Sequence, residues 1–263
     1  PPSIGLGDAI EYGLAIDSIS RKKKFSLSAV AFAGRYKNIF TKYFKIKEVY
    51  GNFIPLNKME KFDMIFHITL EILKLKYQKY NRTDIEDVLT KHFNVNKKKI
   101  TKKVFRNKIK KINIFPISQS PVRSMSPYLI RKIFDFYNQD YDINIILDKT
   151  SEISNYIENQ INLKESYKLF PSNLENLCKI IKDTEFGIFI DSGPLHLAKL
   201  FYIKGVLIST TVSGKILLNR FKNIKEIKNN YYSKYCSAPC GLTNLINVNN
   251  RIGCYDSLKI LKK

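Results

Sequence analysis

The sequence predicts an α/β protein made of two Rossmann-like halves, each an open sheet of parallel strands flanked by helices. Short β-branched runs such as residues 112–117 alternate with longer segments of helical pattern, an alternation typical of βαβ units. A dense basic stretch over residues 97–111 separates the halves, so we predict a domain boundary before residue 112 and a cleft between the halves. The 263 residues are 44% hydrophobic, enough for packed cores.

The elements follow from that alternation. In the first half (residues 1–111), helices are predicted over 7–19 and 36–44, and strands over 26–32, 47–50 and 63–68. In the second half (residues 112–263), strands are predicted over 112–117, 143–147, 187–190 and 205–209. Helices are predicted there over 127–139, 151–160 and 173–183, with a further helix starting near Pro194, a residue favoured in the first turn.

The chain is strongly basic, with 45 Lys and Arg against 23 Asp and Glu and a net charge of +22. The first 112 residues hold 25 basic and 10 acidic residues. Such a surplus favours an anionic partner, namely the phosphates of a small ligand, acidic lipids or nucleic acid. A coding bias toward AT-rich codons is the alternative. The run 97–111 interleaves apolar with basic residues, as a membrane-surface segment does, but a solvated helix face or linker would look the same.

Membrane-spanning and secreted proteins are not expected. No run of about eighteen apolar residues exists that could cross a bilayer as a helix. The N-terminus has no basic head followed by an apolar stretch, so we expect no secretory signal.

The segment Gly5-Leu6-Gly7-Asp8 enters the first predicted helix. Two glycines allow a tight turn, and Asp8 then lies at or near a helix N-terminus. There its carboxylate either caps backbone N–H groups or accepts a proton from a substrate hydroxyl, and both interpretations stay open. A dinucleotide fingerprint would need a third glycine at position 10, which is Ile10, so a nicotinamide cofactor is disfavoured.

The segment Asp191-Ser192-Gly193-Pro194-Leu195-His196-Leu197-Ala198 connects a buried strand to a helix. Backbone N–H groups of Ser192 and Gly193 are expected at the positive end of the helix dipole, a geometry that binds phosphate. His196 lies one turn inside the helix, within reach of the same anion. The sequence therefore predicts a phosphate site here.

Three motifs resemble those of glycosyltransferase family 9, the lipopolysaccharide heptosyltransferases and their relatives. Residues 191–198 resemble its D-[ST]-G-P-x-H-x-A motif, Gly7-Asp8 resembles its N-terminal G-D motif, and residues 115–127 resemble the strand, phosphate-facing loop and basic residue that open its C-terminal domain. The resemblance implies a GT-B fold and inverting, metal-independent transfer from a nucleotide-sugar, with an ADP-sugar favoured and heptose the expected sugar. No other cofactor is implied.

The resemblance also implies roles for single residues. Asp8 matches the general base, and Gly5 and Gly7 form the acceptor-side loop. The matched donor and diphosphate contacts are Ser118, Arg123, Asp191, Ser192, Gly193 and His196. Glu152 falls roughly where a ribose-binding acid would lie. The implied acceptor is a glycolipid of the lipopolysaccharide type, which predicts a bacterial cytoplasmic enzyme bound peripherally to the anionic inner face of the inner membrane.

Three cysteines near the C-terminus, Cys236, Cys240 and Cys254, leave their chemistry open. They are three ligands of a zinc or iron site, a disulfide with one spare thiol, or a reduced structural cluster.

Two other functions remain as alternatives. A basic nucleic-acid-binding protein would use residues 97–111, but no recognised nucleic-acid motif accompanies the charge, so this partner is disfavoured. A non-catalytic relative would keep only the nucleotide pocket.

Overall fold

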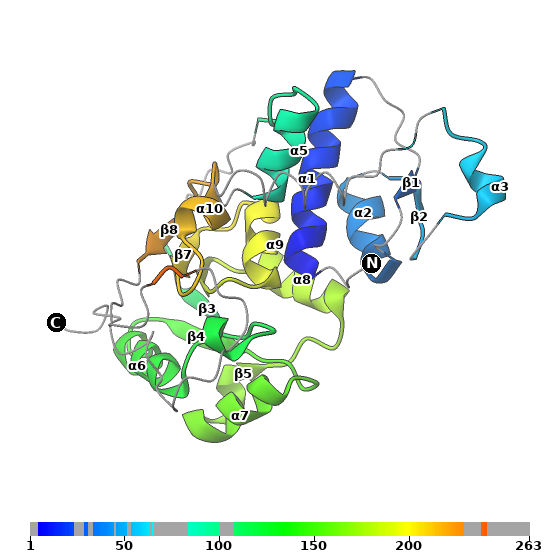
Figure 1. Ribbon diagram of the computed structural model, residues 1–263. Helices are drawn as coiled ribbons and strands as arrows, with labels where there is room; N and C mark the ends of the chain where they lie inside the picture. Colours follow the sequence, from blue (N-terminus) through cyan, green and yellow to red (C-terminus); the bar gives the residue numbers. More distant parts are fainter. Residues whose placement is uncertain are drawn as a thin grey trace. The chain divides into compact units, whose positions relative to one another are not determined.

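A computed structural model describes residues 5–23, 29–30, 34–44, 46–51, 54–63, 65, 84–99, 108–228 and 238–240. The chain divides into two compact units, residues 1–101 and 102–263. In Figure 1, unit 1 runs from blue to teal and unit 2 from green to orange. The predicted boundary before residue 112 stays a prediction, because residues 100–107 lie outside the described part of the chain. No helix among the described residues is long and apolar enough to cross a membrane.

Unit 1 is built around two packed helices, α1 (Leu6–Lys23) and α5 (Ile85–His92). The side chain of Asp84 caps α5 by accepting from the Asp87 N–H at 2.6 Å. The other described elements are β1 (Ala29–Val30), α2 (Lys37–Tyr43), β2 (Glu48–Val49), which pairs in parallel with β1, and α3 (Leu56–Met59).

The helices predicted over 7–19 and 36–44 are therefore confirmed, and so is the strand over 47–50. The strand predicted over 26–32 is present at its described residues, 29–30. Most of the strand predicted over 63–68 lies outside the described residues.

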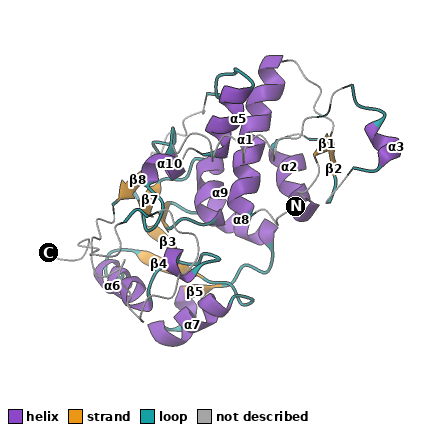
Figure 2. Cartoon of the chain, in the orientation of Figure 1, coloured by secondary structure: helices purple, strands orange, loops and turns teal. Residues whose placement is uncertain are grey.

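Unit 2 is a six-stranded, wholly parallel sheet with the order β5-β4-β3-β6-β7-β8. Figure 2 shows these strands in orange among the purple helices that connect them. The strands are β3 (Lys111–Phe115), β4 (Asp142–Ile146), β5 (Lys168–Leu169), β6 (Phe186–Phe189), β7 (Gly205–Ile208) and β8 (Ile224–Ile227). The four strands predicted for this half are confirmed to within two residues at each end.

Five α-helices connect these strands: α6 (Pro127–Tyr137), α7 (Glu152–Ile161), α8 (Leu174–Lys182), α9 (Gly193–Phe201) and α10 (Gly214–Leu218). Helix α6 packs with α7, and α8 packs with α9. The four predicted helices are confirmed. The sequence did not predict β5, α10 or β8, because the first two are very short and the third places Lys225 and Glu226 between its two isoleucines.

The core of unit 2 is rich in buried isoleucine. Ile114 of β3 and Ile145 of β4 are completely buried, and they belong to one cluster with Ile130 of α6 and Ile157 of α7. Burial of one such side chain contributes about 1.5–3 kcal/mol relative to its exposure to water. β-branched side chains also suit strands covered on both faces, which explains why the strand positions could be read from sequence.

Two glycines make room for an aromatic stack within the sheet. The rings of Phe115 and Phe189 stack with their centroids 5.0 Å apart and their planes 10° from parallel. A Cβ added to Gly187 would lie 2.1 Å from the Phe189 ring. A Cβ added to Gly205 would lie 2.1 Å from the carbonyl oxygen of Gly187. Any side chain at position 205 therefore collides with backbone, which cannot swing away.

We predict that Gly205→Ala lowers the free energy of unfolding by about 1–3 kcal/mol, the usual cost of overpacking. Urea unfolding followed by circular dichroism measures the change. Gly51→Ala is the matched control, because nothing lies within 4 Å of a Cβ added there. Equal stability of the two variants would contradict the packing role of Gly205.

Candidate functional site

The sheet of unit 2 contains a topological switch point between β3 and β6. These two strands are neighbours, but the chain continues from β3 to β4 on one side and from β6 to β7 on the other. Segments that follow the two strands therefore diverge at the carboxyl edge of the sheet. Open α/β sheets bind their ligands at this position.

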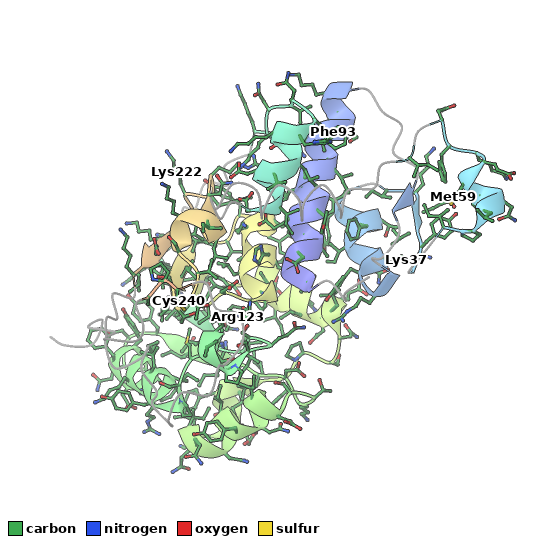
Figure 3. All side chains as sticks on the ribbon, viewed as in Figure 1. Lys37, Met59, Phe93, Arg123, Lys222 and Cys240 are labelled. Carbon is green, nitrogen blue, oxygen red and sulfur yellow. The ribbon has the colours of Figure 1, made fainter. Side chains whose placement is uncertain are left out.

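The loop after β3 is held in shape by Ser124. Its hydroxyl accepts a hydrogen bond from the Ser118 N–H at 3.0 Å and contacts the carbonyl oxygens of Ser118 and Ser120. The Met125 N–H then donates to the carbonyl of Pro116 at 2.9 Å, which closes the loop at its base. A short 3-10 helix over Pro121–Arg123 sets the position of the Arg123 side chain, labelled in Figure 3.

The loop after β6 is tied to the loop after β3 through Asp191. The Ser118 hydroxyl donates to the Asp191 carbonyl at 3.1 Å, and the Arg123 Nη1 group donates to the Asp191 carboxylate at 3.2 Å. The Arg123 side chain is 20% exposed and that of Asp191 10% exposed, so this ion pair is largely shielded from water. The structure thus brings together three residues that the sequence assigned to donor binding.

Helix α9 begins directly after this pair and has no side-chain cap. Ser192 is its N-cap residue, but the Ser192 hydroxyl donates to the Ile190 carbonyl at 3.4 Å instead of capping the helix. The other α-helices described in unit 2 all begin with a side chain that accepts a backbone N–H. The uncapped N-terminus of α9, at Ser192 and Gly193, therefore presents backbone N–H groups and the positive end of the helix dipole to an anion.

Several buried polar atoms near this edge have no hydrogen-bond partner among the described residues. They are the hydroxyls of Ser120, Thr210 and Thr211 and the Nε group of Arg123. Thr210 and Thr211 come shortly after β7, the other neighbour of β6. A buried polar group without a partner costs about 1–3 kcal/mol, so each such group in a native protein needs an explanation. A ligand that supplies the missing partners is one explanation.

Ser120, Thr210 and Thr211 were not predicted as site residues from the sequence. The signal was available, because Ser209-Thr210-Thr211 follows a buried strand as an unbroken polar run at the carboxyl edge. Hydroxyl residues in that position are common, however, and only the lack of internal partners distinguishes these three.

His196 lies within α9, where it is buried except for 8% of its surface. Its Nδ1 atom lies 3.4 Å from the Nζ atom of Lys199, one turn further along the helix. The Lys199 side chain is 1% exposed, and its ammonium group also donates to the carbonyl of Leu217 at 2.7 Å. Lys199 was not predicted as a site residue, because a lysine late in a helix is usually exposed.

Glu152 is not brought into this cluster. It is the exposed first residue of α7, and no hydrogen bond or ion pair within the described residues joins it to Arg123 or Asp191.

Of the three C-terminal cysteines, only Cys240 lies within the described residues, as a free thiol. Cys236 and Cys254 lie outside them. Among the described residues, no group of three His, Cys, Asp or Glu side chains is arranged to hold a metal ion.

In unit 1, Asp8 occupies the first turn of α1 and closes its N-terminus. Its Oδ2 atom accepts a hydrogen bond from the Gly5 N–H at 3.2 Å, while the side chain stays exposed. The helix begins at Leu6, so Gly7 belongs to its first turn and only Gly5 lies before it. The pKa of Tyr36 is raised mainly by burial, and the negative charge of the Asp8 carboxylate raises it further. Asp8 therefore caps the helix while its carboxylate remains exposed to solvent.

Two lysines of the basic run make ion pairs within unit 1. Lys97 pairs with Asp87, and Lys98 pairs with Asp17 at 2.9 Å. Residues 100–107 of the run lie outside the described part of the chain. Part of the positive charge of this segment is therefore neutralised by acidic side chains of unit 1.

A six-stranded parallel sheet with connecting helices and a switch point, as in unit 2, defines a Rossmann-like α/β fold. No family model matches the sequence, and no curated protein matches it by sequence. Solved structures do match in fold.

E. coli heptosyltransferase WaaC with ADP-2-deoxy-2-fluoro heptose matches at a TM-score of 0.55 and 8% identity, over 86% of this chain and 91% of that one. E. coli ADP-heptose lps heptosyltransferase II matches at 0.57 and 11%, over 85% and 87%. The iron-containing dodecameric glycosyltransferase TibC of enterotoxigenic E. coli matches at 0.58 and 10%, over 99% and 70%. The predicted resemblance to the heptosyltransferases is thus confirmed in fold, and the fold is of the GT-B type.

We predict that Arg123 and Asp191 stabilise one another in the absence of ligand. In a double-mutant cycle of Arg123→Met and Asp191→Ala, the coupling energy should be about 0.5–3 kcal/mol, the range found for residues in direct contact. Either single change leaves a largely buried charge unpaired, so the double variant should be more stable than the sum of the single losses implies. Unfolding by urea measures all four proteins, and strictly additive losses would contradict the pairing.

Proposed function

We propose that the protein is a glycosyltransferase that transfers a sugar from a nucleotide diphosphate donor, with ADP-heptose as the favoured donor. The observation that carries this proposal is the uncapped N-terminus of α9 beside the Arg123–Asp191 pair, at the switch point of a sheet with the heptosyltransferase fold. Two of the fold neighbours support the choice of nucleotide, since the WaaC structures hold ADP or an ADP-heptose analogue.

The leaving group explains why these residues suit the reaction. As the bond between the sugar carbon and the diphosphate breaks, negative charge develops on the diphosphate and positive charge on the sugar carbon. The N–H groups of Ser192 and Gly193 and the guanidinium of Arg123 stabilise that negative charge. In this proposal they take the part that a divalent cation plays in metal-dependent transferases, so the transfer is metal-independent. His196 and Ser118 complete the donor side.

Asp8 is proposed as the general base. The acceptor hydroxyl oxygen attacks the sugar carbon from the face opposite the diphosphate, and its proton passes to the Asp8 carboxylate, so the configuration at that carbon is inverted. The Oδ2 atom of Asp8 accepts the capping bond from the Gly5 N–H, and the side chain is exposed to solvent. This supports a carboxylate that caps the helix and still meets a substrate.

The acceptor is proposed to be a glycolipid of the lipopolysaccharide type, reached at the cytoplasmic face of the inner membrane. The net charge of +22 supports an acceptor or membrane surface that carries phosphates and acidic sugars.

We predict that the wild-type protein binds ADP more tightly than GDP, UDP or CMP, and that Arg123→Met weakens ADP binding about 10- to 100-fold. The loss follows from removing one charge-assisted hydrogen bond to phosphate, worth about 1.5–3 kcal/mol. Calorimetric titration with each nucleotide provides the affinities.

Lys222→Met is the control for this titration, because Lys222 lies exposed in the turn before β8 (Figure 3) and loses the same charge away from the site. Unchanged ADP affinity in Arg123→Met would show that Arg123 is not part of the donor site. Preference for another nucleotide would overturn the assignment of ADP alone.

We predict that Asp8→Asn lowers the turnover number about 10²- to 10⁴-fold while the affinity for ADP stays at the wild-type value. Asparagine keeps the shape of the side chain and an acceptor for the Gly5 N–H, but it cannot take up the proton. Nucleotide release from donor and glycolipid acceptor, followed in a coupled assay, measures turnover. Asp63→Asn, an exposed carboxylate of the same unit, is the matched control. Wild-type turnover in Asp8→Asn would show that Asp8 is not the general base.

The same assay separates catalysis from a non-catalytic relative. Such a protein would bind ADP at the α9 edge, yet release no nucleotide from any donor even with Asp8 intact.

A further inference from the structure

Lys199 is a lysine enclosed within the protein behind the donor site. It lies on α9 three residues after His196, so both side chains share one helix face. The contacts of its ammonium group include Nδ1 of His196 at 3.4 Å, the carbonyl oxygen of Leu217 at 2.7 Å, and the ring of Phe221, 5.0 Å from centroid to Nζ. With 1% of its surface exposed, the side chain has little freedom to move.

The contact between Lys199 and His196 fixes which of the two groups donates the hydrogen bond. A lysine ammonium has three N–H donors and no acceptor, so towards His196 it can only donate. Nδ1 must then carry the lone pair, which places the ring proton of neutral His196 on Nε2. The carbonyl oxygen of Leu217 accepts a hydrogen bond from the ammonium, and the ring of Phe221 makes a cation–π contact with it. Both contacts keep Nζ beside the imidazole.

We propose that Lys199 is a positioning residue that fixes His196 in the tautomer with its proton on Nε2. Resting on the proposed function, this tautomer supplies an N–H donor for the diphosphate of the nucleotide-sugar, whereas the other tautomer would present a lone pair to an anion. Lys199 acts through His196 and does not itself contact the nucleotide.

A merely structural lysine would behave differently. If Lys199 only joined α9 to α10 through the Leu217 carbonyl, its removal would lower stability and leave the protonation pattern of His196 unchanged. The tautomer is therefore the decisive readout, and stability is not.

The test is nitrogen NMR of the full chain labelled with ¹⁵N-histidine, at about pH 8, above the ordinary titration range of histidine. The chain has three histidines, His67, His92 and His196, so His196→Gln assigns the resonances. In the wild type, His196 should show a protonated Nε2 and an unprotonated Nδ1. Lys199→Met keeps the apolar stem but removes the donor, so the two tautomers should become mixed. Lys199→Arg keeps a donor-only side chain and should restore the wild-type pattern.

Lys215→Met is the matched control, since Lys215 is an exposed lysine of α10 that lies two residues before Leu217. ADP affinity should fall about 3- to 10-fold in Lys199→Met, from the partial loss of one hydrogen bond, and stay unchanged in Lys215→Met. A wild-type His196 protonated on Nδ1, or an unchanged tautomer in Lys199→Met, overturns the inference even if a variant folds poorly, because the first result needs no variant. If wild-type protein holds the expected tautomer but binds no ADP, the proposed function fails and the assignment of Lys199 stands.

Discussion

Asp191 connects the two loops on which the site depends. Its backbone carbonyl accepts from Ser118 and its carboxylate pairs with Arg123, so both contacts cross from the loop after β6 to the loop after β3. These loops diverge because the chain leaves β3 and β6 in opposite directions across the sheet. Without a connection, the divergence would separate the cation from the helix N-terminus. One residue therefore holds Arg123 beside the start of α9.

Helix α9, which follows Asp191, differs from the other α-helices described in unit 2 because no side chain caps its N-terminus. Elsewhere in the described part of unit 2, a serine or asparagine closes the start of each α-helix. At α9 the cap residue Ser192 turns its hydroxyl back to the strand instead. Leaving a helix end uncapped costs about 1 kcal/mol. Such a cost is expected where the N–H groups serve an anionic ligand.

The sequence predicted this region well because the signals are local. Buried strands such as β3 are rich in β-branched residues, a composition typical of strands covered on both faces. Pro194, a residue favoured at the start of a helix, indicated the position of α9. What sequence did not indicate depends on contacts between distant segments. Lys199 meets Leu217 eighteen residues later, and the lack of partners at Thr210 and Thr211 can be judged only in the folded chain. Glu152 was placed by analogy alone, and no contact in the described residues ties it to the cluster.

The pairing of Arg123 with Asp191 raises the question of how the same guanidinium would meet a phosphate. Arginine has five N–H donors arranged as a planar fork, and the ion pair is made through Nη1 alone. The buried Nε group has no partner in the described part of the chain. Asp191 can therefore orient the guanidinium without using all its donors, and in the proposed donor site the remaining ones would be left for phosphate oxygens. A lysine at this position would lack the planar fork, whose fixed donors can bind a carboxylate and a phosphate in defined directions.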